Sequence, residues 1–322
     1  MINLLDSRQL LAFQALARHG SFTAAAKSLN LTQSAISHSI KALERSLEVT
    51  LFERLGKTVR LTRAGESLLV HSERILSRMH RAQEDLRLLE RPGHGRLRIG
   101  ATVTISQYIL PSVLRELRET FPAFEISVKT DDSLGLMDSL EAGEIDVAVA
   151  LRTPRSGSLV DRVLFQDEIQ MAFSPVHPLA NRAKLSKKDV QDENFIIYGE
   201  TSETFRLLEK ETAANGLRLN TALQVGSMAA IKEMAKIGMG VGLMVPWVAE
   251  QEISEGKLVF HPFPLGKLTR SWEIFRDPRH EKKMIEEVFC GICQNVVDTI
   301  LMRTGQLISS QSNPVELKSK QG

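Results

Sequence analysis

The feature that most constrains this chain is a long helical segment that ends at a sharp break. Residues 66–89 contain neither glycine nor proline. The break follows at Pro92-Gly93-His94-Gly95, a combination that ends a helix and starts a loop. At 322 residues, the chain is also too long for one ordinary domain. We therefore expect a helix near 63–90 that joins two separate modules.

This helical segment carries a heptad pattern. Its seam, with steps of four and three, comprises Leu68, Ser72, Ile75, Met79, Ala82, Leu86 and Leu89. Such a seam is typical of a helix that pairs with a second copy of itself. We predict a dimerisation linker helix at 63–91, with contacts made by Leu68, Ile75, Met79, Leu86 and Leu89. A helix that packs on its own body is the alternative interpretation.

The residues before the linker predict three short helices followed by a hairpin. Asp6, Ser21 and Thr32 each stand where they can cap the N-terminus of one of these helices. Apolar residues at 36, 40, 43 and 47 form one face of the third helix. Gly56-Lys57 supplies a turn between two short strands. Residues 1–62 therefore predict an all-α-type module with a hairpin behind a helix–turn–helix.

The other face of the third helix carries short polar and basic side chains. Such groups suit base edges and phosphates in the major groove of double-stranded DNA, and cations on the hairpin suit the backbone or the minor groove. Residues 1–91 hold 14 Lys and Arg against 9 Asp and Glu, a net charge of +5, whereas the remainder carries −3. The predicted DNA-binding residues are Ser21, Thr32, Gln33, Ser34, Ser37, His38, Lys41, Arg54, Lys57 and Arg60.

The chain after the break alternates between strand and helix patterns. Strands are predicted at 97–101, 124–130, 146–151, 170–174, 194–198, 222–225 and 242–245, and helices at 106–120, 133–142, 204–215, 227–237 and 280–302. This alternation predicts an α/β domain with a mainly parallel sheet, and its size favours two lobes. We place this domain at 92–303 and a flexible, polar tail at 304–322.

Hydroxyl side chains follow several of the predicted strands and precede helices. In two-lobed α/β domains, ligands bind beyond the carboxyl ends of parallel strands, against helix N-termini. Hydroxyls beside free backbone N–H groups suit a small anion. Each of these residues can equally be a helix cap and nothing more. The predicted effector-binding residues are Thr102, Thr104, Ser133, Thr201, Ser202 and Ser227.

The N-terminal motifs resemble those of LysR-type transcriptional regulators. The matching segments are LAF at 11–13, GSFTAAA at 20–26, LTQSAIS at 31–37, IKALE at 40–44, LFER at 51–54, VRLT at 59–62 and AG at 64–65. The linker helix and the two-lobed domain fit the same family, so the resemblance covers nearly the whole chain. His38 departs from the pattern, because many members carry Arg there. A weaker or pH-sensitive DNA contact is expected at that position.

The resemblance implies a regulator of transcription with a winged helix–turn–helix and a two-lobed effector domain like that of periplasmic binding proteins. It also implies a homodimer or homotetramer, a small-molecule effector in the cleft between the lobes, and a contact with RNA polymerase. The expected function is sequence-specific DNA binding switched by a small, anionic effector.

Several other functions are disfavoured by what the sequence lacks. It shows no Ser-His-Asp or Cys-His arrangement, His-rich cluster or catalytic carboxylate pair. We therefore expect no enzymatic activity, no cofactor and no metal. No apolar run approaches the length that spans a bilayer, and no basic segment precedes an apolar one at the N-terminus. A cytoplasmic protein without membrane contact is expected, which disfavours an exported solute-binding protein.

Two alternatives remain within the DNA-binding class. Cys290 and Cys293 form a C-x-x-C pair on the last predicted helix, which leaves a redox-responsive regulator open. Core packing is the simpler interpretation of these cysteines. A ligand-independent DNA-binding protein is also possible if side chains such as Met171, Phe205 and Met228 fill the cleft.

Overall fold

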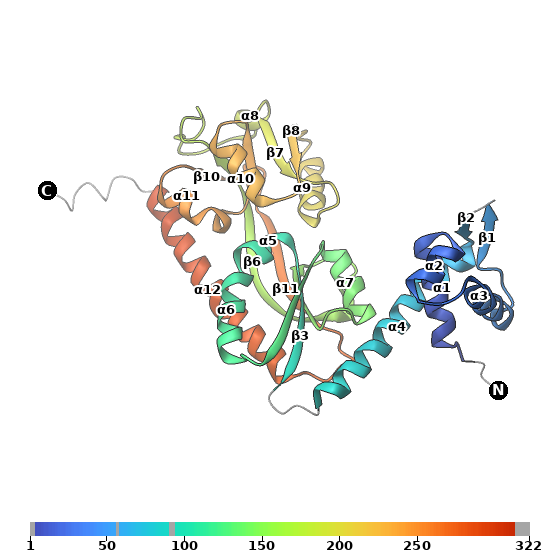
Figure 1. Ribbon diagram of the computed structural model, residues 1–322. Coiled ribbons are helices and arrows are strands. Elements are labelled where there is room, and N and C mark those ends of the chain that lie inside the picture. The colour runs from blue at the N-terminus through green and yellow to red at the C-terminus, as the bar shows by residue number, and fades with distance from the viewer. Residues whose placement is uncertain (1–3, 56–57, 90–93, 313–322) are drawn as a thin grey trace. The chain divides into compact units, whose positions relative to one another are not determined.

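A computed structural model describes residues 4–55, 58–89 and 94–312. The chain divides into a first unit, which ends at His94 and also includes Glu141–Glu144, and a second unit, which comprises Gly95–Leu140 and the chain from Ile145 onward (Figure 1). Within the described residues, no helix is both long enough and apolar enough to cross a membrane.

The first unit consists of three short helices, a hairpin and one long helix. These elements are α1 (Ser7–His19), α2 (Phe22–Ser28), α3 (Gln33–Leu47), β1 (Phe52–Leu55), β2 (Thr58–Leu61) and α4 (Arg63–Leu89). The two strands pair antiparallel, with Phe52 opposite Leu61. The predicted winged helix–turn–helix and the helix that follows it are confirmed.

Local hydrogen bonds explain where these helices begin and end. The Asp6 carboxylate accepts from the backbone N–H groups of Arg8 and Gln9 at 2.7 and 3.4 Å, which caps α1. Gly20 ends this helix in the left-handed conformation, with φ of 62°. The prediction that the Ser21 side chain caps α2 is wrong. Ser21 stands at the N-cap position, but its side chain makes no capping hydrogen bond.

The core of the first unit is built from α1, α3 and the start of the hairpin. Phe13 and Phe52 pack with their ring centroids 5.3 Å apart, and Ile36, Ile40 and Leu43 are buried beside them. The first turns of α4 also join this core. Leu68 packs against it, and the buried Ser72 hydroxyl accepts from Gln14 Nε2 at 3.3 Å. The N-terminal end of the predicted seam therefore packs within its own unit.

The second unit contains one curled sheet covered by helices. Its strands are β3 (Gly95–Ala101), β4 (Phe124–Thr130), β5 (Val147–Leu151), β6 (Val160–Phe173), β7 (Asn194–Tyr198), β8 (Asn220–Val225), β9 (Val241–Met244), β10 (Val259–Pro262) and β11 (Leu268–Phe275). The strand order is β4-β3-β5-β11-β6-β9-β7-β8, and β10 pairs with β6.

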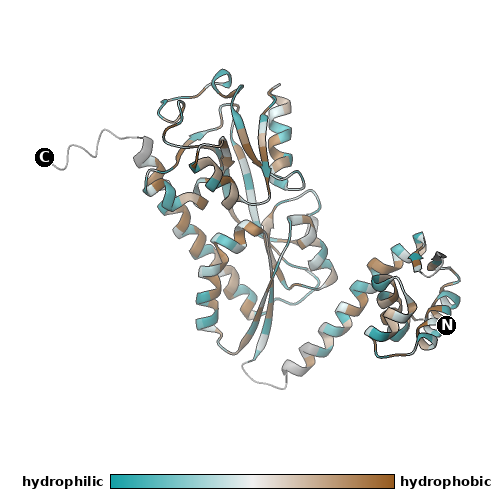
Figure 2. Ribbon diagram, turned by 45° about the horizontal axis from the view of Figure 1, so that its top comes forward, coloured by the Kyte–Doolittle hydropathy of each residue, from teal (hydrophilic) through white to brown (hydrophobic). Residues whose placement is uncertain are grey.

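The α-helices of this unit are α5 (Val103–Tyr108), α6 (Leu110–Thr120), α7 (Ser133–Ala142), α8 (Lys187–Val190), α9 (Glu203–Ala214), α10 (Met228–Lys236), α11 (Glu250–Ser254) and α12 (Met284–Ser312). Two 3₁₀ turns, η1 (Gly157–Leu159) and η2 (Pro246–Ala249), complete it. Hydrophobic and hydrophilic residues alternate along α6 and α12 in Figure 2.

Two long strands connect the two lobes of the sheet. In the first lobe β3 pairs parallel with β4 and β5, and in the second β7 pairs parallel with β8 and β9. The strands β6 and β11 pair antiparallel with each other. They run from one lobe into the other (Figure 1). The predicted two-lobed α/β architecture is confirmed. The prediction of a mainly parallel sheet is wrong: the sheet is mixed, because β11 also runs antiparallel to β5, and β6 antiparallel to β9 and β10.

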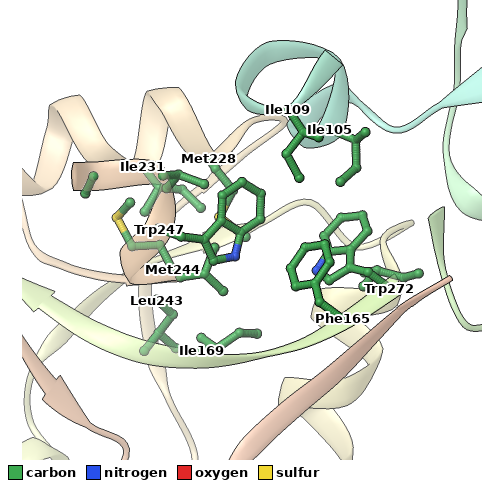
Figure 3. Packing of buried hydrophobic residues seen from close by; sticks show 14 of the residues in the cluster. Ile105, Ile109, Phe165, Ile169, Met228, Ile231, Leu243, Met244, Trp247 and Trp272 are labelled. Atoms are coloured by element: carbon green, nitrogen blue, oxygen red, sulfur yellow. The ribbon is translucent and has the colours of Figure 1, made fainter. Parts of the chain in front are cut away.

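A cluster of aromatic rings fills the centre of this unit. Phe165 of β6 stacks on Trp272 of β11, with centroids 5.8 Å apart and planes inclined by 13°. Trp247 meets both rings edge-on. Ile105 of α5 and Met228 of α10 belong to the same buried cluster (Figure 3). The lobes therefore share one hydrophobic core.

Three further sequence predictions differ from the structure. The helix predicted to end at residue 302 continues to Ser312, so the flexible tail predicted at 304–322 is wrong up to Ser312, and residues 313–322 lie outside the described residues. Thr304 is buried, and Leu307 and Ile308 pack on the core. The helix predicted at 106–120 is two helices, α5 and α6. The strands β10 and β11 and the first half of β6 were not predicted.

Candidate functional site

The outer face of α3 is a polar surface at the start of a helix. Thr32 Oγ1 accepts from the backbone N–H of Ala35 at 3.2 Å, which fixes the first turn. Gln33, Ser34, His38 and Lys41 are exposed, and Ser37 is half-buried. The first turn holds no acidic residue. The surface therefore combines hydrogen-bonding side chains with the positive end of a helix dipole.

The hairpin is tied to the helices beside it. The backbone N–H of Val59 donates to Gly20 O at 3.0 Å, and Glu44 Oε1 accepts from the N–H of Leu51 at 2.8 Å. Arg60 is exposed on β2. The predicted contact Lys57 lies outside the described residues, and the side chain of Arg54 lies outside them too. Of the three predicted cations of the hairpin, Arg60 is therefore the one whose side chain is described.

The seam of α4 is uncovered beyond Ser72. Ile75, Met79 and Leu86 are 37%, 45% and 65% exposed, while Leu68 packs in the core of its own unit. The side chain of Leu89 is outside the described part of the chain. Apolar side chains at heptad spacing on an exposed helix face are suited to a second helix.

A cavity of about 210 Å³ lies between the two lobes. It is lined by the loops that follow β3, β4, β7 and β8, together with Arg270 and Trp272 of β11. The structure brings five predicted residues together in its lining: Thr102, Thr104, Ser133, Thr201 and Ser202. Ser227 does not line the cavity, although its neighbour Gly226 does.

These hydroxyl groups differ in the hydrogen bonds that they already make within the protein. Ser202 Oγ accepts from the N–H of Phe205 at 3.0 Å and donates to Gly199 O at 2.8 Å, so it is a helix cap. Ser227 caps α10 through the N–H of Ala230 at 3.2 Å. Ser133 Oγ accepts from the N–H of Leu151 at 3.2 Å.

Two threonines at the start of α5 are better placed for a ligand. The Thr102 hydroxyl is buried and has no hydrogen-bond partner within the described chain. Buried polar groups are normally paired, so an orphan beside a cavity points to an external partner. Thr104 hydrogen-bonds Tyr198; burial raises the pKa of Tyr198, and this hydrogen bond opposes the rise.

Below the cavity lies a buried ion pair that the sequence did not reveal. Arg270 Nε and Nη2 donate to the Asp167 carboxylate at 2.9 and 2.6 Å, and Arg270 Nη1 donates to Thr204 Oγ1 at 2.7 Å. The indole N–H groups of Trp247 and Trp272 donate to the same carboxylate at 2.9 and 2.8 Å. Asp167 thus joins both long strands, η2 and, through Arg270, α9.

The charges at the cavity do not match a simple anion site. Asp131, Asp132 and Glu203 are among its lining residues, and the one cation of that lining, Arg270, is already paired with Asp167. Asp132 Oδ1 accepts from the N–H of Gly135 at 2.8 Å, so a carboxylate of the chain itself caps α7. The lining therefore provides hydroxyl groups for a ligand, but no unpaired positive charge.

The structure also bears on the two alternative functions. Met171, Phe205 and Met228 do not line the cavity, and the two methionines are buried in the core. Cys290 and Cys293 are both buried, and burial raises the pKa of the Cys290 thiol to about 11 and that of Cys293 well above its ordinary value. Among the described residues, no His, Cys, Asp and Glu side chains are grouped to hold a metal ion.

Comparisons with known proteins agree with this arrangement. Residues 7–66 match the family of bacterial regulatory helix-turn-helix proteins of the lysR type, and residues 90–297 match the LysR substrate binding domain. The chain is 28% identical over 281 residues to the HTH-type transcriptional activator CmpR of Synechocystis, covering 87% of this chain and 92% of CmpR.

Two further proteins extend the likeness. The chain is 30% identical over 256 residues to the uncharacterized HTH-type transcriptional regulator YwqM of Bacillus subtilis, covering 79% of this chain and 87% of YwqM. Full-length CbnR, solved with its target DNA, has a similar fold with a TM-score of 0.63 at 21% identity, covering 95% of this chain and 100% of CbnR. With both family models matched along its length, the chain belongs to the LysR family of transcriptional regulators, with a helix-turn-helix DNA-binding domain followed by a LysR substrate-binding domain.

Proposed function

We propose that α3 reads DNA sequence in the major groove and that the hairpin contacts the DNA backbone. Gln33 lies in the first turn of α3 and is exposed, and its amide can bond adenine at two points. Ser34, Ser37, His38 and Lys41 supply further donors, and Lys41 can reach a phosphate. Arg54, Lys57 and Arg60 add backbone contacts. Ser21 and Thr32 act near phosphates, Thr32 mainly as the cap that orients α3.

The cavity between the lobes is the proposed effector site. Thr102, Thr104, Ser133 and Thr201 would bond the effector, with the orphan Thr102 hydroxyl as the main anchor. Ser202 and Ser227 would act as caps that hold the loops in place. An effector that prefers one arrangement of the lobes shifts the population toward it, by no more than its difference in affinity for the two states.

The proposed assembly is a homodimer or homotetramer paired through α4. Ile75, Met79, Leu86 and Leu89 would form the contact, while Leu68 supports the helix from within. Two α3 helices would then reach successive major grooves of a near-palindromic site. The protein would act on DNA in the cytoplasm, contact RNA polymerase there, and carry no catalytic activity of its own.

The observation that carries this proposal is the combination, in one chain, of an exposed polar recognition helix and a separate cavity beside a buried hydroxyl that has no partner among the described residues. Pools of small metabolites tested by thermal shift provide the test, because a ligand that binds only the folded state raises Tm. We expect one pool to raise Tm and to change the DNA footprint.

Substitutions make this test specific for the cavity. Thr102→Val should lose the Tm response, whereas Thr299→Val, at an exposed threonine of α12 outside the lining, should keep it. A ligand that raises Tm in Thr102→Val as much as in the unchanged protein, or that leaves the footprint unchanged, would contradict the proposed switch.

A further inference from the structure

A second and larger hollow lies next to the effector cavity. Its volume is about 500 Å³, within the range of small-molecule sites, and its lining includes Arg152, Arg206, Lys210 and Arg270. Glu203 is the one carboxylate in the lining. We refer to this region as the basic hollow. Its lining holds four cations against one carboxylate, whereas the lining of the effector cavity holds one cation against three carboxylates.

The cations of the basic hollow come from both lobes. Arg152 directly follows β5 of the first lobe, and its backbone N–H donates to Ser271 O of β11 at 2.9 Å. Arg206 and Lys210 lie four residues apart on α9 of the second lobe, and so share one helix face. Like charges from the two lobes therefore line the same hollow, and their mutual repulsion is relieved when an anion binds between them.

The protein compensates only part of this charge. Arg270 is paired with Asp167, and Arg206 with Glu203. Arg152 Nη1 donates to the buried Glu273 at 3.2 Å, but its side chain is 63% exposed. Lys210 makes no hydrogen bond or ion pair with any part of the chain that the structure describes. Open donors thus remain on Arg152 in one lobe and on Lys210 in the other.

We propose that the basic hollow is a second ligand site, which binds a small oxyanion with two or more negative charges. An Arg fork and a Lys ammonium group on opposite sides suit a phosphate or carboxylate group at each end of such a molecule. The site differs from the effector cavity in its ligand class. Leu151, Glu203 and Arg270 line both, so an anion here is coupled to the effector cavity through this shared wall.

Inorganic pyrophosphate is the probe, titrated into the full chain with added salt holding the ionic strength constant. Both tryptophans of the chain, Trp247 and Trp272, bond to Asp167, the partner of Arg270. Their fluorescence therefore reports on this domain and not on pyrophosphate bound by the DNA-binding unit. We expect a saturable change in fluorescence, and weaker binding of singly charged acetate.

Lys210→Ala is the decisive variant, since it removes a side chain that has no hydrogen bond or ion pair within the described residues and should leave folding intact. It should weaken pyrophosphate binding at least tenfold. Arg152→Gln should do the same, whereas Lys184→Ala, at an exposed lysine outside the hollow, should have no effect. Equal affinity in Lys210→Ala and the unchanged protein, or no saturable change in fluorescence, would overturn the proposal. Neither variant alters the hydroxyls of the effector cavity, so failure here is distinct from failure of the proposed effector site.

Discussion

Asp167 and Arg270 form a two-point ion pair, at 2.6 and 2.9 Å, between the two strands that connect the lobes. Both side chains are buried, and two indole N–H groups complete the hydrogen bonding of the carboxylate. A charge buried without its partner is costly, so this pair depends on both members. It therefore fixes where α9 and the wall of the effector cavity lie.

Replacement of Asp167 by Asn should strongly destabilise the second unit. The change leaves the Arg270 charge buried and uncompensated, and we expect a loss of about 3–5 kcal/mol in the free energy of unfolding. Urea denaturation followed by tryptophan fluorescence measures this loss directly, because both tryptophans touch Asp167. Asp192→Asn, at an exposed residue without a hydrogen bond or ion pair among the described residues, is the matched control. A loss below about 1 kcal/mol for Asp167→Asn would show that the pair is not structurally important.

Introduction of a charge into the exposed seam of α4 should separate the subunits. Met79→Glu places a carboxylate where the partner helix would pack, which costs more than the apolar contact provides. We expect a monomer at micromolar concentration in analytical ultracentrifugation, together with weaker DNA binding. Val70→Glu changes another exposed apolar residue of the same helix off the seam and should leave the assembly intact. Dissociation by both variants, or by neither, would exclude the seam as the interface.

The two cysteines should be unreactive in the folded protein. The thiolate is the reactive form, and burial raises the pKa of Cys290 to about 11, so at pH 8 only about one thiol in a thousand is ionised. Alkylation of both thiols should be slow at pH 8, speed up as the pH rises toward 11, and be fast in urea. DNA binding should survive peroxide. Rapid oxidation with loss of DNA binding at pH 8 would instead support the redox-responsive alternative.

Substitutions at Gln33 and Arg60 should affect DNA binding differently, because Gln33 is proposed to read bases and Arg60 to contact the DNA backbone. Gln33→Ala should relax preference at one base pair of each half-site by about 1–3 kcal/mol. Arg60→Ala should instead weaken binding to all sequences alike and reduce the salt dependence by about one unit. Affinity measured over a set of single-base variants at several salt concentrations distinguishes the two. A uniform loss for Gln33→Ala would contradict its proposed role.

Local signals in the sequence predicted the DNA-binding unit and the hydroxyls of the cavity well. The Thr32 cap, the buried face of α3 and the loops after β3 and β7 all depend on neighbouring residues, which a sequence displays directly. The end of α12 was missed because Thr304 is polar yet buried. The Thr304 hydroxyl has a hydrogen-bond partner inside its own helix, because it donates to Ile300 O at 2.9 Å, one turn earlier.

The ion pair under the cavity could not be predicted from local signals in the sequence. Arg270 and Asp167 are 103 residues apart, and the strands that hold them carry further charged residues, among them Glu168 of β6 and Glu273 of β11. Charged residues of this kind make a buried strand look like a loop, which is why β11 and the first half of β6 were not predicted. Only the pairing of the strands shows that the two charges neutralise each other. The basic hollow was missed for the same reason, since its cations come from three separate elements.

We propose above all that this chain is a dimeric, sequence-specific DNA-binding regulator. Selection of bound duplexes from a random pool by the purified protein, at a stated salt concentration, tests it most directly. We expect enrichment of a near-palindromic site with half-sites about one helical turn apart. Binding to all duplexes alike, sensitive to salt and without enrichment in the absence or presence of metabolite pools, would contradict it.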